Sequence, residues 1–151
     1  MKYVKSNSKD GNVISTKRCD YQVLLDIILK HTDIVCFTAS PYLDSIDELR
    51  EDIRYKKIID SYIDSEYKKS IHTENCNEYL VYFKLDYYVR EFLKEKKDIF
   101  DFYDEDANIN LEDIVFIGKN GIVCDTITHE QYCWLSDDLL YEIKIKKGIN
   151  D

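Results

Sequence analysis

The sequence predicts an α+β fold, with helices packed on one side of a mostly antiparallel sheet. A chain of 151 residues has the usual length of a single domain, and its 44% apolar content is enough for one hydrophobic core. With only four Gly and one Pro, most of the chain is expected in helices and strands. Runs with the periodicity of strands alternate with runs of helical spacing, which favours this class over an all-α or all-β fold.

In the first third of the chain, we expect a hairpin, a helix and a strand. Residues 3–17 alternate weakly around Asp10-Gly11, a pair that favours tight turns because Gly accepts positive φ. Asp20 is a candidate cap for a helix that ends near Lys30. Its expected buried residues are Val23, Leu24, Ile27 and Ile28. The apolar run 33–39 then has the length of a buried strand.

The middle of the chain predicts a long helix, then a strand and a second helix. Ser45 and Glu48 match a capping box, and apolar residues recur at roughly helical spacing as far as Tyr67. Residues 79–85 are rich in aromatic and aliphatic side chains, as in a strand. Asp86 is a candidate cap for a helix that ends near Lys97.

The C-terminal third predicts a hairpin over 114–128, because two β-type runs flank the Asn120-Gly121 step. Thr128 and Gln131 fit another capping box, and apolar residues continue at helical spacing to Ile143. We therefore expect a helix over most of 129–146. A break near Ser136, where a fresh helix could begin, stays open as the alternative.

The sequence predicts a reduced cytoplasmic protein that neither spans a membrane nor binds nucleic acid. The N-terminus lacks the apolar stretch of a signal peptide. Five cysteines form an odd number without CxxC pairs, as in reduced thiols.

The net charge of −9 comes from one segment of the sequence. Residues 1–97 hold 17 acidic and 17 basic side chains, whereas residues 98–142 hold twelve acidic side chains and one Lys. Clustered like charges repel one another, so they favour association with a basic partner and disfavour nucleic acid. The aromatic residues between them are of the types enriched at interface hot spots.

We therefore predict that this acidic segment docks a basic protein. The expected partner-binding residues are Asp98, Asp101, Phe102, Tyr103, Asp104, Glu105, Asp106, Glu112, Asp113, Trp134, Asp137 and Asp138. The alternative is a solvated acidic surface that aids solubility, with the aromatic residues in the core.

Motifs for metal binding or catalysis are incomplete. Cys124, His129 and Cys133 have a spacing that suits zinc, but a structural site needs a fourth ligand. The acidic cluster 104–110 fails as a calcium loop, because position 6 is not Gly and position 12 is not Glu in either register. Cys124, Asp125 and His129 are the best candidates for cysteine or acid-base catalysis. We expect no metal, no cofactor and no catalysis.

In composition, the chain resembles the small acidic immunity proteins that bacteria keep beside secreted toxins, many of which are basic nucleases. This resemblance implies a non-enzymatic inhibitor that neutralises a basic toxin by direct binding. Two alternatives stay open. One is a small enzyme that uses Cys124, Asp125 and His129, and the other is an adaptor or regulatory domain that binds a different basic protein.

Overall fold

A computed structural model describes residues 10–41, 43, 45–69 and 77–147. It confirms the predicted α+β class. The strands are β1 (Ile34–Ser40), β2 (Tyr62–Lys69), β3 (Asn77–Lys84), β4 (Asn110–Gly118), β5 (Gly121–Ile127) and β6 (Tyr132–Leu135). They form one sheet in the order β2-β3-β1-β4-β5-β6, and every neighbouring pair is antiparallel.

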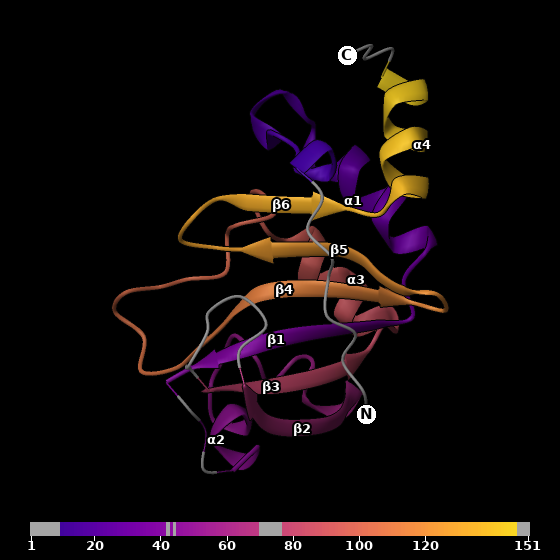
Figure 1. Cartoon of the computed structure of the whole chain (residues 1–151). Coiled ribbons are helices and arrows are strands. Elements are labelled where there is room, and N and C mark those ends of the chain that lie inside the picture. Colours follow the sequence, from indigo (N-terminus) through magenta and orange to yellow (C-terminus); the bar gives the residue numbers. More distant parts are fainter. Residues whose placement is uncertain (1–9, 42, 44, 70–76, 148–151) are drawn as a thin grey trace.

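Three longer helices accompany the sheet, namely α1 (Tyr21–Lys30), α3 (Tyr87–Lys94) and α4 (Asp137–Lys147). The short α2 (Asp47–Arg50) and the 3-10 turns η1 (Asp10–Asn12), η2 (Thr16–Arg18) and η3 (Ile59–Ser61) complete the described elements. In Figure 1, α1 and α3 lie behind the sheet, and α4 stands beside α1. No helix within the described ranges is both long and apolar enough to cross a membrane.

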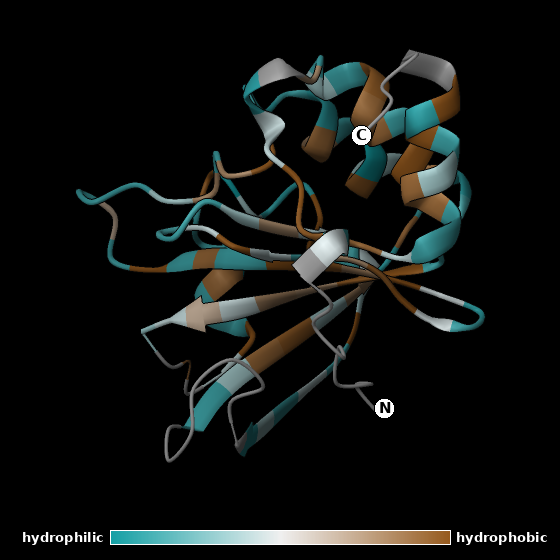
Figure 2. Cartoon of the chain, turned by 45° about the horizontal axis from the view of Figure 1, so that its top comes forward, coloured by the Kyte–Doolittle hydropathy of each residue, from teal (hydrophilic) through white to brown (hydrophobic). Residues whose placement is uncertain are grey.

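The main core lies between the sheet and these helices. Phe37 of β1 is at its centre and makes aromatic contacts with Phe83, Phe92 and Phe102 at centroid distances of 5.8, 6.3 and 5.8 Å. Figure 2 shows apolar residues along the strands and polar residues in the loops at their ends. A smaller cluster, built around Cys36, Leu80, Tyr82 and Val115, lies on the opposite face of the sheet.

Local sequence signals account for the elements that were predicted correctly. The carboxylate of Asp20 accepts hydrogen bonds from the N–H groups of Gln22 and Val23, so it caps α1. Asp86 caps α3 in the same way through Val89 N–H. The strands β1 and β3 and the β4–β5 hairpin lie where they were expected. Val23, expected to be buried in α1, is instead exposed.

The predicted long helix over 45–67 is wrong. The backbone N–H of Ser45 does reach Glu48 Oε2 at 3.5 Å, but α2 ends at Arg50 and the chain enters β2 at Tyr62. Pairing of β2 with β3 satisfies the backbone of 62–69 and overrides the helical spacing of the apolar residues. Ile53 and Ile63, two of the apolar residues at helical spacing in this segment, are exposed.

Two terminal expectations also need correction. Residues 132–135 form β6 against β5, so the helix begins only at Asp137, at the break that was the alternative. Asp10-Gly11 lies in a 3-10 turn, and Val13 bridges to Trp134 of β6. The remainder of the expected N-terminal hairpin, residues 3–9, lies outside the described residues.

The β4–β5 hairpin packs tightly against the end of α1 at Gly118. A Cβ at this position would overlap the main-chain carbonyl oxygen of His31, whereas a Cβ at Gly11 would meet nothing within 4 Å. We expect Gly118→Ala to lower the free energy of unfolding by about 1–3 kcal/mol, because the backbone must shift to relieve the overlap. Gly11→Ala is the control and should stay within about 0.5 kcal/mol of the wild type. Equal urea midpoints for the two variants would contradict the observed packing.

Candidate functional site

The cysteine and histidine candidates do not converge. Cys124 and Cys133 lie on neighbouring strands within the core, with their Sγ atoms 3.8 Å apart. Burial raises the pKa of the Cys124 thiol, which disfavours the nucleophilic thiolate. Asp125 follows Cys124 in β5 and therefore points to the opposite face of the sheet, while His129 lies on the exposed turn after β5. Within the described ranges, no group of three potential metal ligands comes together.

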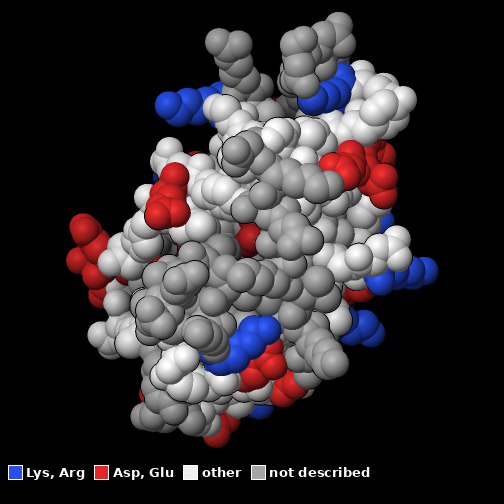
Figure 3. All heavy atoms as spheres, viewed as in Figure 1, with Lys and Arg blue, Asp and Glu red and all other residues white. Residues whose placement is uncertain are grey.

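The strand directions divide the acidic segment between two ends of the sheet. Residues 98–109 and the turn 128–131 lie at the end where β4 begins and β5 finishes. Asp137 and Asp138 lie at the other end, beside the turn of the β4–β5 hairpin, roughly 20 Å away by the length of β5 at about 3.3 Å per residue. Figure 3 accordingly shows acidic side chains in separate groups on the visible face. The predicted partner-binding residues are therefore not one continuous surface.

Burial further separates these residues. Phe102 and Trp134 are only 4% and 8% exposed and belong to the packed interior, and Glu112 is 7% exposed. Asp98 and Asp101 accept hydrogen bonds from backbone N–H groups of their own loop. Asp98, Asp137 and Asp138 are exposed, and the longest exposed run in the set is Tyr103, Asp104, Glu105 and Asp106, which we name the acidic loop. Its aromatic member, Tyr103, is 48% exposed.

Arg54 and Asn110 hold the acidic loop in place. The side chain of Asn110 accepts the Asp104 N–H and donates to the Asp104 carbonyl, both at 3.0 Å. Arg54 donates to Asn110 Oδ1 at 3.0 Å, to the Ile109 carbonyl and to the Asp52 carboxylate. Asn110 is buried and Arg54 is largely so, which strengthens these charge-assisted bonds. Asn110 therefore holds the acidic loop directly, and Arg54, 56 positions earlier in the chain, holds Asn110.

We expect Arg54→Met to lower the free energy of unfolding by about 1.5–3 kcal/mol, because several charge-assisted hydrogen bonds are lost together. Amide exchange at Asp104 should accelerate, since the loop loses its anchor through Asn110. Arg50→Met removes the same charge from an exposed Arg whose described ion pair is with Asp47, three residues earlier. This control should change stability by less than about 0.5 kcal/mol. Similar losses in both variants would show that Arg54 has no special role.

A buried carboxylate lies beside the acidic loop. Glu112 of β4 pairs with Thr38 of β1 and so lies on the sheet face away from the helices. Its Oε1 is 3.5 Å from His129 Nε2, and its Oε2 is buried and has no hydrogen-bond partner among the described residues. The ring of Tyr103 meets the His129 ring edge-on at a centroid distance of 4.6 Å. We name Glu112, His129 and Tyr103 the Glu112 cluster.

Unusual backbone geometry frames the Glu112 cluster. A β-bulge interrupts the β1–β4 pairing at Asp113, which has a φ of 54°, and Gln131 in the following turn has a φ of 51°. Asp113 and Thr128 exchange two hydrogen bonds of 2.7 and 3.0 Å, which fix the turn that carries His129. Left-handed non-glycine residues and bulges are both enriched next to functional sites. The geometry therefore singles out this cluster in a way that the sequence did not.

Burial raises the pKa of the Glu112 carboxyl, Asp113 raises it further, and His129 opposes the rise. The folded protein therefore binds a proton at Glu112 more tightly than the unfolded chain does. As pH rises from about 4.3 through the folded pKa, ionisation of Glu112 lowers the free energy of unfolding. We expect Glu112→Gln to raise the thermal midpoint at pH 7, with the gain shrinking as pH falls through this interval.

The exposed neighbour Glu130 provides the control, and Glu130→Gln should leave the midpoint almost unchanged at every pH. Thermal melts of the three proteins from pH 4 to pH 7 would test this. A gain for Glu112→Gln that does not depend on pH would contradict the proposed cause.

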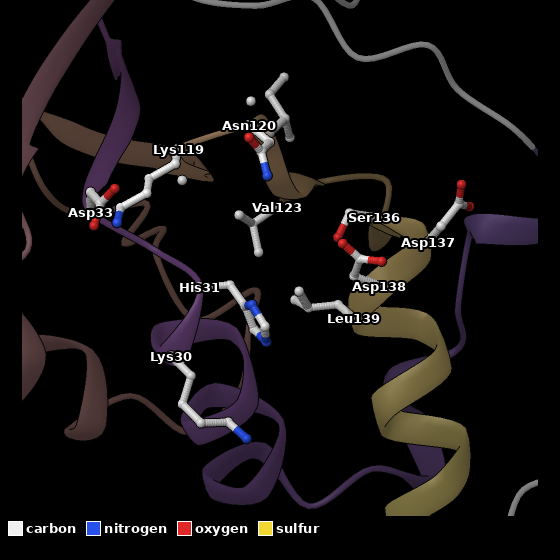
Figure 4. Close-up of a pocket in the computed structure, with 13 residues that line it drawn as sticks. Lys30, His31, Asp33, Lys119, Asn120, Val123, Ser136, Asp137, Asp138 and Leu139 are labelled. Carbon is white, nitrogen blue, oxygen red and sulfur yellow. The ribbon is translucent and has the colours of Figure 1, made fainter.

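The second acidic group lines an open hollow of about 520 Å³ between the end of α1, the β4–β5 hairpin and the start of α4. Figure 4 shows the His31 ring turned into this hollow, across from Ser136 and Asp138. The two helix ends at the hollow carry opposite charges. Lys30 lies in the last turn of α1, and Asp137 and Asp138 lie in the first turn of α4. Each sign suits the dipole of its helix end, so stabilisation of the two helices accounts for these charges.

Comparison of the chain with protein-family models, curated proteins and solved structures finds no match. The acidic loop and the Glu112 cluster are therefore the features of the molecule from which a function can be proposed.

Proposed function

We propose that this chain is a non-enzymatic binding protein that docks a basic protein through the acidic loop. The observation that carries the proposal is an exposed run of one aromatic and three acidic residues on an ordered loop. Exposed carboxylates attract a basic partner and speed its association, and Tyr103 offers apolar contact area beside them. Because Arg54 and Asn110 already fix the loop, less conformational entropy is lost on binding.

The specific form that we propose is an immunity protein, which neutralises a basic bacterial toxin by covering its cationic site. A toxin that acts on nucleic acid needs such a site to hold phosphates, and carboxylates compete for it. An adaptor for a different basic protein would use the same surface, so the identity of the partner separates these two proposals. The separation of Cys124, Asp125 and His129 leaves the enzyme alternative without a supporting geometry.

Charge reversal in the acidic loop tests the proposal. The side chains of Glu105 and Asp106 are exposed, and no described hydrogen bond uses them. We expect Glu105→Lys with Asp106→Lys to slow association with a basic toxin about tenfold at low salt, because electrostatic steering is lost. The difference in association rate between the variant and the wild type should become smaller as the salt concentration rises, because screening limits the range of attraction between exposed charges to about 8 Å at 0.15 M.

The control is Asp26→Lys with Asp60→Lys, which changes net charge equally at exposed sites outside the acidic loop. Its association rate should fall much less. The protein to test first is the product of the gene directly upstream, because an immunity gene usually follows the gene of its toxin. Failure of that product to bind would overturn the immunity proposal, and equal rates for the two double variants would overturn the role of the acidic loop.

A further inference from the structure

We propose that the Glu112 cluster binds an arginine side chain of the partner, whose guanidinium replaces the imidazole of His129 on the Glu112 carboxylate. This inference rests on the proposed function, since it names the chemical group that the partner presents next to the acidic loop. The inference goes beyond the proposed function because it assigns the selection of the partner to a buried residue, Glu112, whereas the acidic loop supplies exposed charge.

The carboxylate of Glu112 is incompletely paired. A buried carboxylate is normally surrounded by several hydrogen-bond donors or by a cation, because its desolvation is expensive. In the part of the chain that the structure describes, Oε2 has no hydrogen-bond partner, and the contact of Oε1 with His129 is long at 3.5 Å. The imidazole of His129 presents one nitrogen, Nε2, to one of the two carboxylate oxygens. Among the described residues, no side chain offers donors to both oxygens of Glu112.

His129 lies at the surface, in contact with the buried Glu112 carboxylate. Its side chain is 57% exposed, although it contacts a carboxylate that is only 9% exposed. The hydrogen bonds between Asp113 and Thr128 fix the backbone before His129, so the ring can turn toward solvent while the turn stays in place. Rotation of this exposed ring would free the Oε1 atom that it now contacts.

A guanidinium suits this carboxylate better than an ammonium does. A guanidinium is planar and donates two parallel N–H groups, which match both oxygens of a carboxylate, whereas an ammonium is a point charge. The exposed Tyr103 ring, which now meets the His129 ring, would lie beside the incoming group and provide a cation–π contact. Nearby Asp113 and the acidic loop add negative potential, and the strand neighbours Thr38 and Leu80 carry no charge.

The experiment uses N-acetyl-arginine amide as the probe, with N-acetyl-lysine amide and NaCl as comparisons at equal ionic strength. NMR follows the ring resonances of His129 and Tyr103 in the intact chain. We expect saturable shifts with the arginine probe and weaker binding, by about tenfold, of the lysine probe. In Glu112→Gln, affinity for the arginine probe should fall about tenfold, as expected for losing one charge-assisted pair. In Glu130→Gln, which removes an exposed carboxylate from the same turn, affinity should stay near that of the wild type.

Three results would overturn the inference: equal binding of both probes, unchanged binding in Glu112→Gln, or shifts no larger than those caused by NaCl. The last of these would mean that water or a proton satisfies Glu112. The proposed function can fail independently of this inference. If the arginine probe binds at Glu112 but the Glu105→Lys, Asp106→Lys variant captures the toxin normally, the arginine site is supported and docking through the acidic loop is rejected. If the probe does not bind at Glu112 but this variant captures the toxin poorly, docking through the acidic loop is supported and the arginine site is rejected.

Discussion

The position of the central strand β1 is the constraint on which the rest of the molecule depends. Its backbone pairs with β3 on one side and β4 on the other, and its residues alternate between the helix-covered core and the opposite face. Because the side-chain period is two, this register decides which face every residue of β4 and β5 occupies. It turns Cys124 into the core and Glu112 away from it, so the separation of the cysteine candidates from the Glu112 cluster follows from strand pairing.

Much of the fold could be predicted because local signals and burial agree. Capping by Asp20 and Asp86 and the Asn120-Gly121 turn depend on neighbours in sequence, so α1, α3 and the β4–β5 hairpin were predictable. The helices predicted over 45–67 and 129–135 were wrong because apolar residues at helical spacing also occur in segments that pair as strands, β2 with β3 and β6 with β5. For short strands at or near a sheet edge, tertiary pairing outweighs local propensity, and the sequence alone contains no measure of that pairing.

The site was predicted less completely than the fold. Counting charges identified the acidic residues, but only the directions of β4 and β5 divide them between two ends of the sheet. Arg54 lies in a segment expected to be helical and 56 residues before Asn110, so no local pattern links them. Glu112 was predicted as one exposed charge among many. Its burial and its contact with His129 depend on the bulge at Asp113, which a sequence does not reveal.

The proposed function would divide two electrostatic roles between exposed and buried carboxylates. Charges in water interact weakly, so the exposed carboxylates of the acidic loop would affect mainly the rate at which a partner associates. A buried carboxylate interacts strongly with a group that replaces its lost hydration, so Glu112 would affect which partner remains bound. The ordered backbone that carries Tyr103 and Asp104 keeps these two kinds of charge side by side. A surface that merely aided solubility would need neither the anchored loop nor the incompletely paired carboxylate behind it.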